Sequence, residues 1–84
     1  MEATVWTLPD CSICHAVVKT LRNQHWIVKQ RSIEKLVQGE DPNDDALAQY
    51  ALNGGSAPLV FMDGRFLEAH EVSALFNSVE SKQS

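Results

Sequence analysis

The first third of the chain changes its hydrophobic period twice, and this pattern limits the folds open to it. Residues 4–8 are rich in β-branched and aromatic side chains and are followed by Pro9-Asp10, which predicts a strand. From Ser12 the apolar residues take helical spacing, and residues 26–31 return to a strand pattern. A strand, a helix and a second strand in this order predict a right-handed crossover with parallel strands.

The middle of the chain predicts one clear helix and one ambiguous segment. Residues 32–39 are ambiguous, although the apolar residues there are compatible with a short helical turn capped by Ser32. Asp41 and Pro42 predict the start of a helix, because Asp caps free amides and Pro tolerates the first helical position. This helix would end at residues 53–55 and would present an apolar stripe of Ala46, Leu47, Tyr50 and Ala51.

The last third predicts a hairpin and a final helix. Asp63-Gly64 is the strongest turn signal in the chain, and it joins predicted strands over residues 58–62 and 65–67 as an antiparallel pair. A final helix would place Val72, Leu75, Phe76 and Val79 on one face, and residues 81–84 would form a frayed tail. The prediction is therefore one α/β domain over residues 1–84, with the order βαβ-α-ββ-α and a four-stranded mixed sheet flanked by three helices.

Two cysteines, Cys11 and Cys14, lie where the first strand gives way to the first helix. A disulfide between them would close a very short loop and stabilise the fold little. At a helix N-terminus, free amides and the helix dipole favour a thiolate, so we expect the pKa of Cys11 to fall below about 8.5. Three residues on, Cys14 is close enough to bridge. We predict Cys11 as nucleophile and Cys14 as resolving thiol, with Ser12 and Ile13 tuning the potential and shaping the contact surface.

Other chemistries of the pair stay open. Cys11-Ser12-Ile13-Cys14-His15 matches the attachment pattern of c-type haem, with Met62 as a second axial ligand. A metal or iron–sulfur module is a further alternative, and zinc could take its remaining ligands from the histidines. Two inert buried cysteines are the plainest alternative. His15, His25 and His70 taken singly indicate structural or solvated positions, as do Asp44-Asp45 at a helix start, while Trp6 and Trp26 indicate sheet residues packed by helices.

Charge and hydropathy exclude several classes of partner. Lys and Arg number 7 against 11 Asp and Glu, which gives a net charge of −4 and no basic cluster for nucleic acid. Apolar runs of about four residues are too short to span a membrane. With no charged-then-apolar leader before the first strand, we expect a reducing cytoplasm, where a close cysteine pair is typically catalytic or metal-binding.

The segments 7–14 and 56–64 together resemble the glutaredoxin family, and the likeness runs from residue 5 to about 76. The resemblance implies a thioredoxin fold, a monomer, no bound cofactor, and reduction of disulfides in transient protein partners. It also implies that Ala57-Pro58 is a cis peptide packed against the dithiol, keeping metals away and presenting the Ala57 backbone to an extended substrate. Pro9, Ile13 and Pro58 would then form an apolar collar around the sulfurs.

Three positions depart from the glutathione contacts usual in that family. Leu8 stands where a lysine is common, Gly54-Gly55 where a basic or polar pair is common, and Glu68-Ala69-His70-Glu71 where Gly-Gly and an acidic residue are common. We expect Glu68 and Glu71 to lie beside the dithiol and to select against glutathione.

Residues 11–16 also resemble NrdH redoxins, glutaredoxin-like electron donors of ribonucleotide reductase that thioredoxin reductase reduces. The loop 38–44 and the segment 68–70 match neither branch. Both reductants, glutathione and thioredoxin reductase, therefore stay open.

Overall fold

The computed structural model describes residues 1–68 and 70–75. Its elements are β1 (Glu2–Thr7), α1 (Ser12–Asn23), β2 (Ile27–Ser32), α2 (Ile33–Gln38), α3 (Asp44–Leu52), β3 (Leu59–Met62) and β4 (Arg65–Phe66). Residues 70–75 are also helical. Phe76 and Val79 of the predicted final helix, and the predicted frayed tail 81–84, lie outside the described residues.

The four strands form one mixed sheet in the order β2-β1-β3-β4. β1 pairs in parallel with β2 and antiparallel with β3, and β3 pairs antiparallel with β4. The predicted crossover and hairpin are therefore both confirmed, and with them the mixed α/β architecture. At the hairpin, Asp63 and Gly64 have φ values of 54° and 77°, as a two-residue turn of this kind requires.

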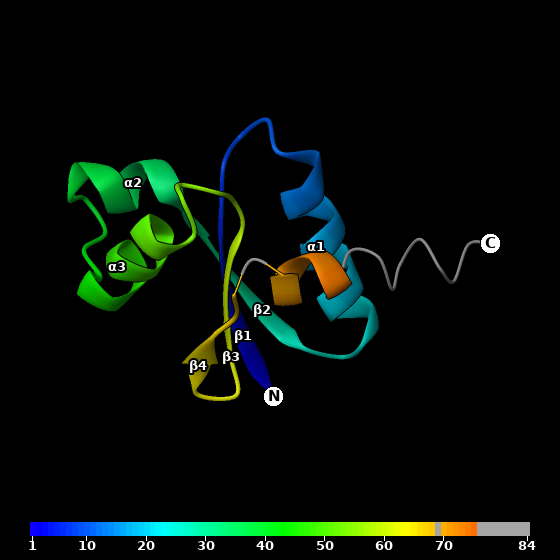
Figure 1. The fold of residues 1–84 in the computed structure, drawn as a ribbon. Helices are drawn as coiled ribbons and strands as arrows, with labels where there is room; N and C mark the ends of the chain where they lie inside the picture. The colour runs from blue at the N-terminus through cyan, green and yellow to red at the C-terminus, as the bar shows by residue number, and fades with distance from the viewer. Residues whose placement is uncertain (69, 76–84) are drawn as a thin grey trace.

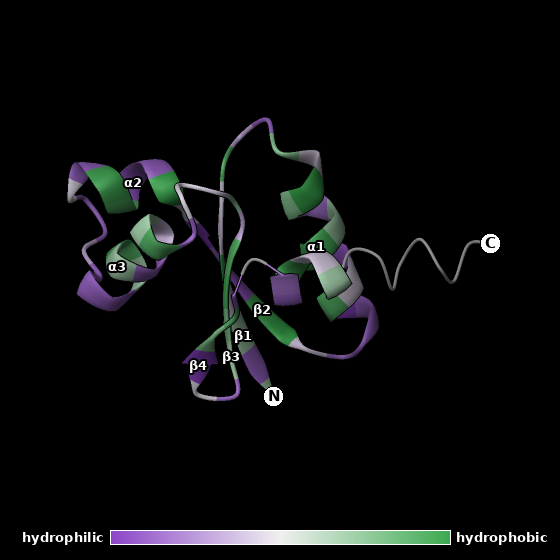
Figure 2. Cartoon of the chain, in the orientation of Figure 1, coloured by the Kyte–Doolittle hydropathy of each residue, from purple (hydrophilic) through white to green (hydrophobic). Residues whose placement is uncertain are grey.

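Helices cover both faces of this sheet. Figure 1 shows α1 on one side of the strands and α2 and α3 on the other. Since neighbouring strand residues point to opposite faces, Val5 of β1 packs in one core cluster with α1, and Trp6 packs in the other. In Figure 2 the apolar residues of the strands run between the two helical layers. The prediction that Trp6 is a sheet residue packed by helices is confirmed.

The two core clusters contain most of the buried apolar residues. The first contains Ala3, Val5, Val17, Val18, Leu21, Val60, Leu67 and Val72. The second contains Trp6, Ile33, Leu36, Ala46 and Leu59. Trp26 precedes β2 by one residue, and its half-buried side chain packs against the first cluster.

The ambiguous segment after the second strand forms α2. Ser32 is its N-cap and accepts a hydrogen bond from the Lys35 N–H at 3.4 Å. Gly39 ends it with φ of 81°, which glycine adopts at little cost. This short helix is additional to the three predicted helices, and it covers the sheet because Ile33 and Leu36 are buried.

The predicted start of the third helix is wrong by two residues. Asn43, not Asp41, is the N-cap, and its Oδ1 accepts a hydrogen bond from the Ala46 N–H at 3.0 Å. Asp41 is unavailable as a cap because both its carboxylate oxygens bind Nη1 of Arg31, at 3.1 and 2.9 Å. A charged partner on β2 outcompetes the neutral amides of the helix end.

The predicted apolar stripe of α3 is confirmed only in part. Ala46 is buried and Tyr50 packs against the second cluster. Leu47 is 43% exposed and Ala51 is also exposed, because this short helix meets the sheet along a single row of side chains. Among the described residues, no helix is both long and apolar enough to cross a membrane.

Leu21→Ala tests the core under α1. The Leu21 side chain is fully buried, so its truncation removes packing and leaves a cavity, and we expect a loss of about 3 kcal/mol in the free energy of unfolding. Leu52→Ala makes the same change at a helical position that is 80% exposed and should cost less than about 0.5 kcal/mol. Denaturant unfolding measures both, and equal losses would contradict the described core.

Candidate functional site

Cys11 and Cys14 are joined by a disulfide at the N-terminus of α1, with their Cα atoms 5.2 Å apart. Cys11 has extended backbone angles and is the N-cap residue of the helix. Its Sγ accepts a hydrogen bond from the backbone N–H of Cys14 at 3.1 Å. One sulfur is thus placed by the helix end itself, and the other follows one turn later.

The two cysteines differ in their exposure to solvent. Cys14 is completely buried, whereas Cys11 is only partly buried. Cys14 is therefore closed to a molecule arriving from solvent, whereas Cys11 keeps part of its surface open. This asymmetry separates the pair from two inert buried cysteines.

The helix end also sets the charge preference at Cys11. An N–H that already donates to Sγ stabilises the thiolate form, and the positive end of the helix dipole acts in the same direction. The first turn of α1 contains no acidic side chain to oppose this effect. Both contributions favour a negative sulfur at position 11.

The Ala57-Pro58 peptide bond is cis, as the resemblance implied. Pro58 is buried directly before β3, and Ala57 is half-buried and packs against the second core cluster. The backbone of this loop is therefore held by the core beneath it. Leu8 packs against the same cluster. An apolar side chain thus occupies the position at which a lysine is common in glutaredoxins.

The remaining predicted contact residues are accessible from outside. Pro9 and Ser12 are exposed on either side of Asp10 and Cys11, and Ile13 is 43% exposed although it lies on α1. An exposed isoleucine between two cysteines offers apolar surface to a partner. Of the predicted collar, Pro9 and Ile13 thus face solvent and Pro58 is buried.

A hollow beside Pro9 was not predicted from the sequence. It has a volume of about 490 Å³ and its lining includes Thr7, Pro9, Arg31 and Lys35. The hollow lies where β1 and β2 both end, the edge at which open α/β sheets commonly bind ligands. Lys35 lies in α2, three residues after β2 ends, so this rule applied to the parallel pair would have pointed to its segment.

Glu71 forms an ion pair with Arg65, the first residue of β4. Arg65 donates to both oxygens of its carboxylate, from Nη1 at 2.9 Å and from Nη2. These hydrogen bonds, with a further one from the Glu68 N–H, lower the pKa of Glu71 from 4.5 to about 2. Its negative charge is therefore offset locally by Arg65.

Among residues 1–68 and 70–75, the potential metal ligands that lie close together include neither cysteine. Among the described residues, one group of three has ligand atoms within 4.8 Å of one another, and it consists of Glu68, His70 and Glu71. His15, His25 and His70 are all exposed, in agreement with solvated positions. Met62 is half-buried and packs against the first core cluster.

Comparison with solved structures gives the fold class. The glutaredoxin-like protein NrdH-redoxin from Escherichia coli matches with a TM-score of 0.62 and 18% identity, over 92% of this chain and 93% of that one. The apo form of glutathione S-transferase III matches with a TM-score of 0.62 and 18% identity, over 98% of this chain but only 36% of that one. The chain has a thioredoxin-like fold.

Comparison of the sequence alone identifies no relative of this chain. No protein-family model matches the chain, and no curated protein matches its sequence. The resemblance that rested on the dithiol, the proline before β3 and the Asp-Gly hairpin is thus supported by structure rather than by overall sequence likeness.

Glu71→Gln tests the ion pair with Arg65. Because the pKa of Glu71 is lowered in the folded state, the pair stabilises the fold above pH 4.5 and loses its effect as pH falls toward 2. At pH 7 we expect this exposed pair to be worth about 2 °C in Tm, with the difference from the parent chain vanishing near pH 2. Thermal unfolding across this pH range measures it, with Glu40→Gln as control. A difference that persists at pH 2 would contradict the pair.

Proposed function

We propose that this chain is a glutaredoxin-type dithiol–disulfide oxidoreductase that reduces disulfides in protein partners. The observation that carries the proposal is the unequal pair at the start of α1, with a partly exposed Cys11 whose sulfur accepts the Cys14 N–H and a fully buried Cys14 one turn away. The thioredoxin-like fold and the redox-motif spacing support the same chemistry.

In the proposed reaction the reduced chain begins with a Cys11 thiolate. It attacks one sulfur of the partner's disulfide, forming a mixed disulfide and releasing the partner's other sulfur as a thiolate, which takes up a proton. Cys14 then loses its proton and attacks Cys11, which releases the second partner thiolate. The partner gains two electrons and two protons, and the chain ends in the disulfide state that the structure shows.

The partner surface in this proposal surrounds Cys11. Pro9, Ser12 and Ile13 offer exposed contact area, while the Ala57 backbone, held beside Pro58, would pair with an extended partner segment. Contacts of this size suit transient encounters rather than a stable complex. The chain would act as a monomer in a reducing cytoplasm, with no resident cofactor.

The reductant that restores the dithiol is thioredoxin reductase in this proposal, in preference to glutathione. Leu8 packs into the core and supplies no cation beside the sulfurs. Arg31 lines the hollow next to Pro9 but its guanidinium is bound by Asp41. Of the two cations in that hollow, this leaves Lys35 alone without an ion pair among the described residues, so a single free cation would be available to the anionic glutathione.

Single cysteine variants test the assigned roles. Cys11→Ser should reduce disulfide turnover to the uncatalysed background, because the accessible nucleophile is lost. Cys14→Ser should still attack but should accumulate a mixed disulfide on Cys11, detectable by mass spectrometry. His25→Gln, an exposed position in the turn before β2, serves as the control. A mixed disulfide trapped on Cys14 in the Cys11→Ser variant would reverse the assignment.

Coupled assays test the reductant. With one disulfide substrate, we expect turnover several-fold faster with NADPH and thioredoxin reductase than with glutathione and glutathione reductase. Lys35→Ala should slow the glutathione reaction further, whereas Lys29→Ala, an exposed lysine on β2 paired with Glu2, should not. Equal or faster turnover with glutathione would contradict the assignment of the reductant while leaving the dithiol chemistry intact.

A further inference from the structure

The loop between α3 and β3 carries the backbone that the proposed partner contact uses. It ends in the peptide Ala57-Pro58, directly before β3. Leu59, the first residue of β3, pairs with Trp6 near the end of β1, so the loop lies at the same edge of the sheet as the residues that lead to Cys11. Figure 1 shows the loop running from α3 to the start of β3 at that edge.

The N–H and C=O groups of Ala57 are available to a partner. Within the part of the chain that the structure describes, no group forms a backbone hydrogen bond with Ser56 or Ala57. The last such bond before Pro58 runs from the Gly55 N–H to the Tyr50 C=O, at 2.9 Å. The position of Ala57 therefore depends on how firmly the backbone at Gly55 is held.

Gly54 and Gly55 give the loop little stiffness of their own. Both have positive φ, 71° and 75°, and glycine has more backbone freedom than any other residue. Ordering two glycines in succession costs conformational entropy, which contacts with a fixed neighbour have to offset. The last turn of α3 provides such contacts, since the N–H groups of residues 53, 54 and 55 all donate to its carbonyls.

Tyr50 reaches this glycine turn with its side chain as well as its backbone. A Cβ atom placed on Gly55 would lie 3.8 Å from Oη and 3.9 Å from Cζ of Tyr50, so the outer end of the phenol lies beside that glycine. The same half-buried side chain packs against the second core cluster, as Ala57 does. Tyr50 thus connects the core with the loop.

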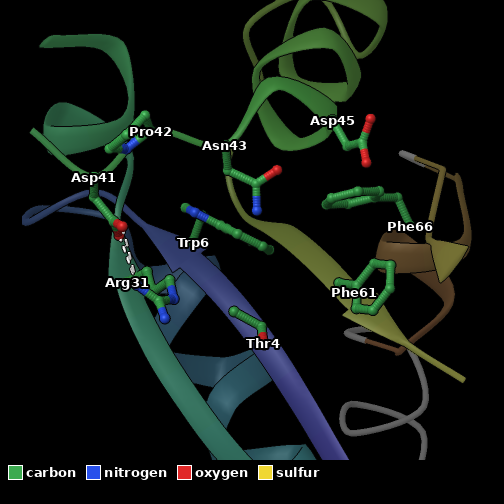
Figure 3. Close-up of a pocket in the computed structure, with 9 residues that line it drawn as sticks. All are labelled: Thr4, Trp6, Arg31, Asp41, Pro42, Asn43, Asp45, Phe61 and Phe66. Carbon is green, nitrogen blue, oxygen red and sulfur yellow. Dashed lines mark hydrogen bonds and ion pairs between the residues drawn. The ribbon is translucent and has the colours of Figure 1, made fainter. Parts of the chain in front are cut away.

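The hollow on the same face of the sheet is separate from this contact. Figure 3 shows it beside Trp6, between Asn43 at the start of α3 and the rings of Phe61 and Phe66, and its volume is about 350 Å³. Of the described residues that line it, none is Tyr50. A shorter side chain at position 50 should therefore loosen the loop without altering the lining of this hollow.

We propose that Tyr50 is a positioning residue that adapts the dithiol to protein substrates. Its ring ties the Gly54-Gly55 turn to the core and thereby holds the N–H and C=O groups of Ala57 where an extended partner segment can pair with them. A small disulfide with no peptide backbone beside its sulfurs gains nothing from Ala57. The inference rests on the proposed function, because it concerns the partner contact of the same dithiol.

Single-turnover kinetics with two disulfides test this role. The chain is reduced with dithiothreitol, desalted, and mixed with insulin, whose disulfides join peptide segments, or with hydroxyethyl disulfide, which is small and neutral. Acid quenching and mass spectrometry give the rate at which the chain is oxidised. Tyr50→Leu keeps an apolar side chain but lacks the outer phenol, and we expect the rate with insulin to fall about fivefold and the rate with hydroxyethyl disulfide to change less than about twofold.

Two control variants and one further measurement accompany this test. Tyr50→Phe removes only Oη and keeps the ring beside the loop, so both rates should stay close to those of the parent chain. Ile33→Val trims the same core cluster from α2 and should also leave both rates unchanged, which separates loop order from general stability. In Tyr50→Leu, ¹⁵N relaxation should show lower order parameters at Gly55 and Ala57 than in the parent chain.

Two results would overturn the proposal on its own. Equal losses with both disulfides would mean that Tyr50 supports the fold or the dithiol as a whole. Unchanged rates with both would mean that Ala57 is positioned without the Tyr50 ring. A parent chain that reduces neither disulfide would refute the proposed function, and this inference with it.

Discussion

The central position of β1 is the constraint on which the rest of the structure depends. β1 is paired along both edges, with β2 and with β3, and helices cover both faces of the sheet, so both faces of β1 are buried. Val5 and Trp6 meet this demand with neighbouring side chains that enter opposite clusters. The same pairing fixes where the strand ends, and thereby delivers the residues after Thr7 to the sheet edge at which α1 begins.

The position of the two cysteines depends on where β1 ends and α1 begins. Residues 8–11 separate β1 from α1, and like any helix α1 leaves free amides at its first turn, which a residue before the helix can cap. Here the capping atom is the sulfur of Cys11. One interaction thus stabilises the helix end and holds the Cys11 sulfur, the proposed nucleophile, and the burial of Cys14 on the next turn comes from the packing of α1 against the sheet.

Features encoded locally could be predicted from the sequence. The Asp63-Gly64 turn needs only its own two residues to adopt positive φ, and the position of Cys11 and Cys14 needs only the change from strand to helix period. The α/β architecture then followed from connection rules. The cis peptide before β3 was accessible through family resemblance and not through spacing.

Features that depend on distant partners could not be predicted in this way. Asp41 is a reasonable helix cap when read along the chain, but Arg31 lies ten residues earlier and binds its carboxylate. The environment of Leu8 was likewise decided by the core cluster that it joins, and that of Glu71 by Arg65, six residues earlier on β4. In each case a neighbour in space set the outcome.

The ion pair of Arg31 and Asp41 links the two hollows of the molecule. Both residues line the hollow beside Pro9 and also the hollow beside Trp6. The pair is therefore a shared wall, drawn in Figure 3 as the dashed contact at the edge of the hollow beside Trp6. Because Asp41 is held by Arg31 instead of by the helix end, Asn43 caps α3. A single non-local contact thus lines both hollows and decides which residue begins α3.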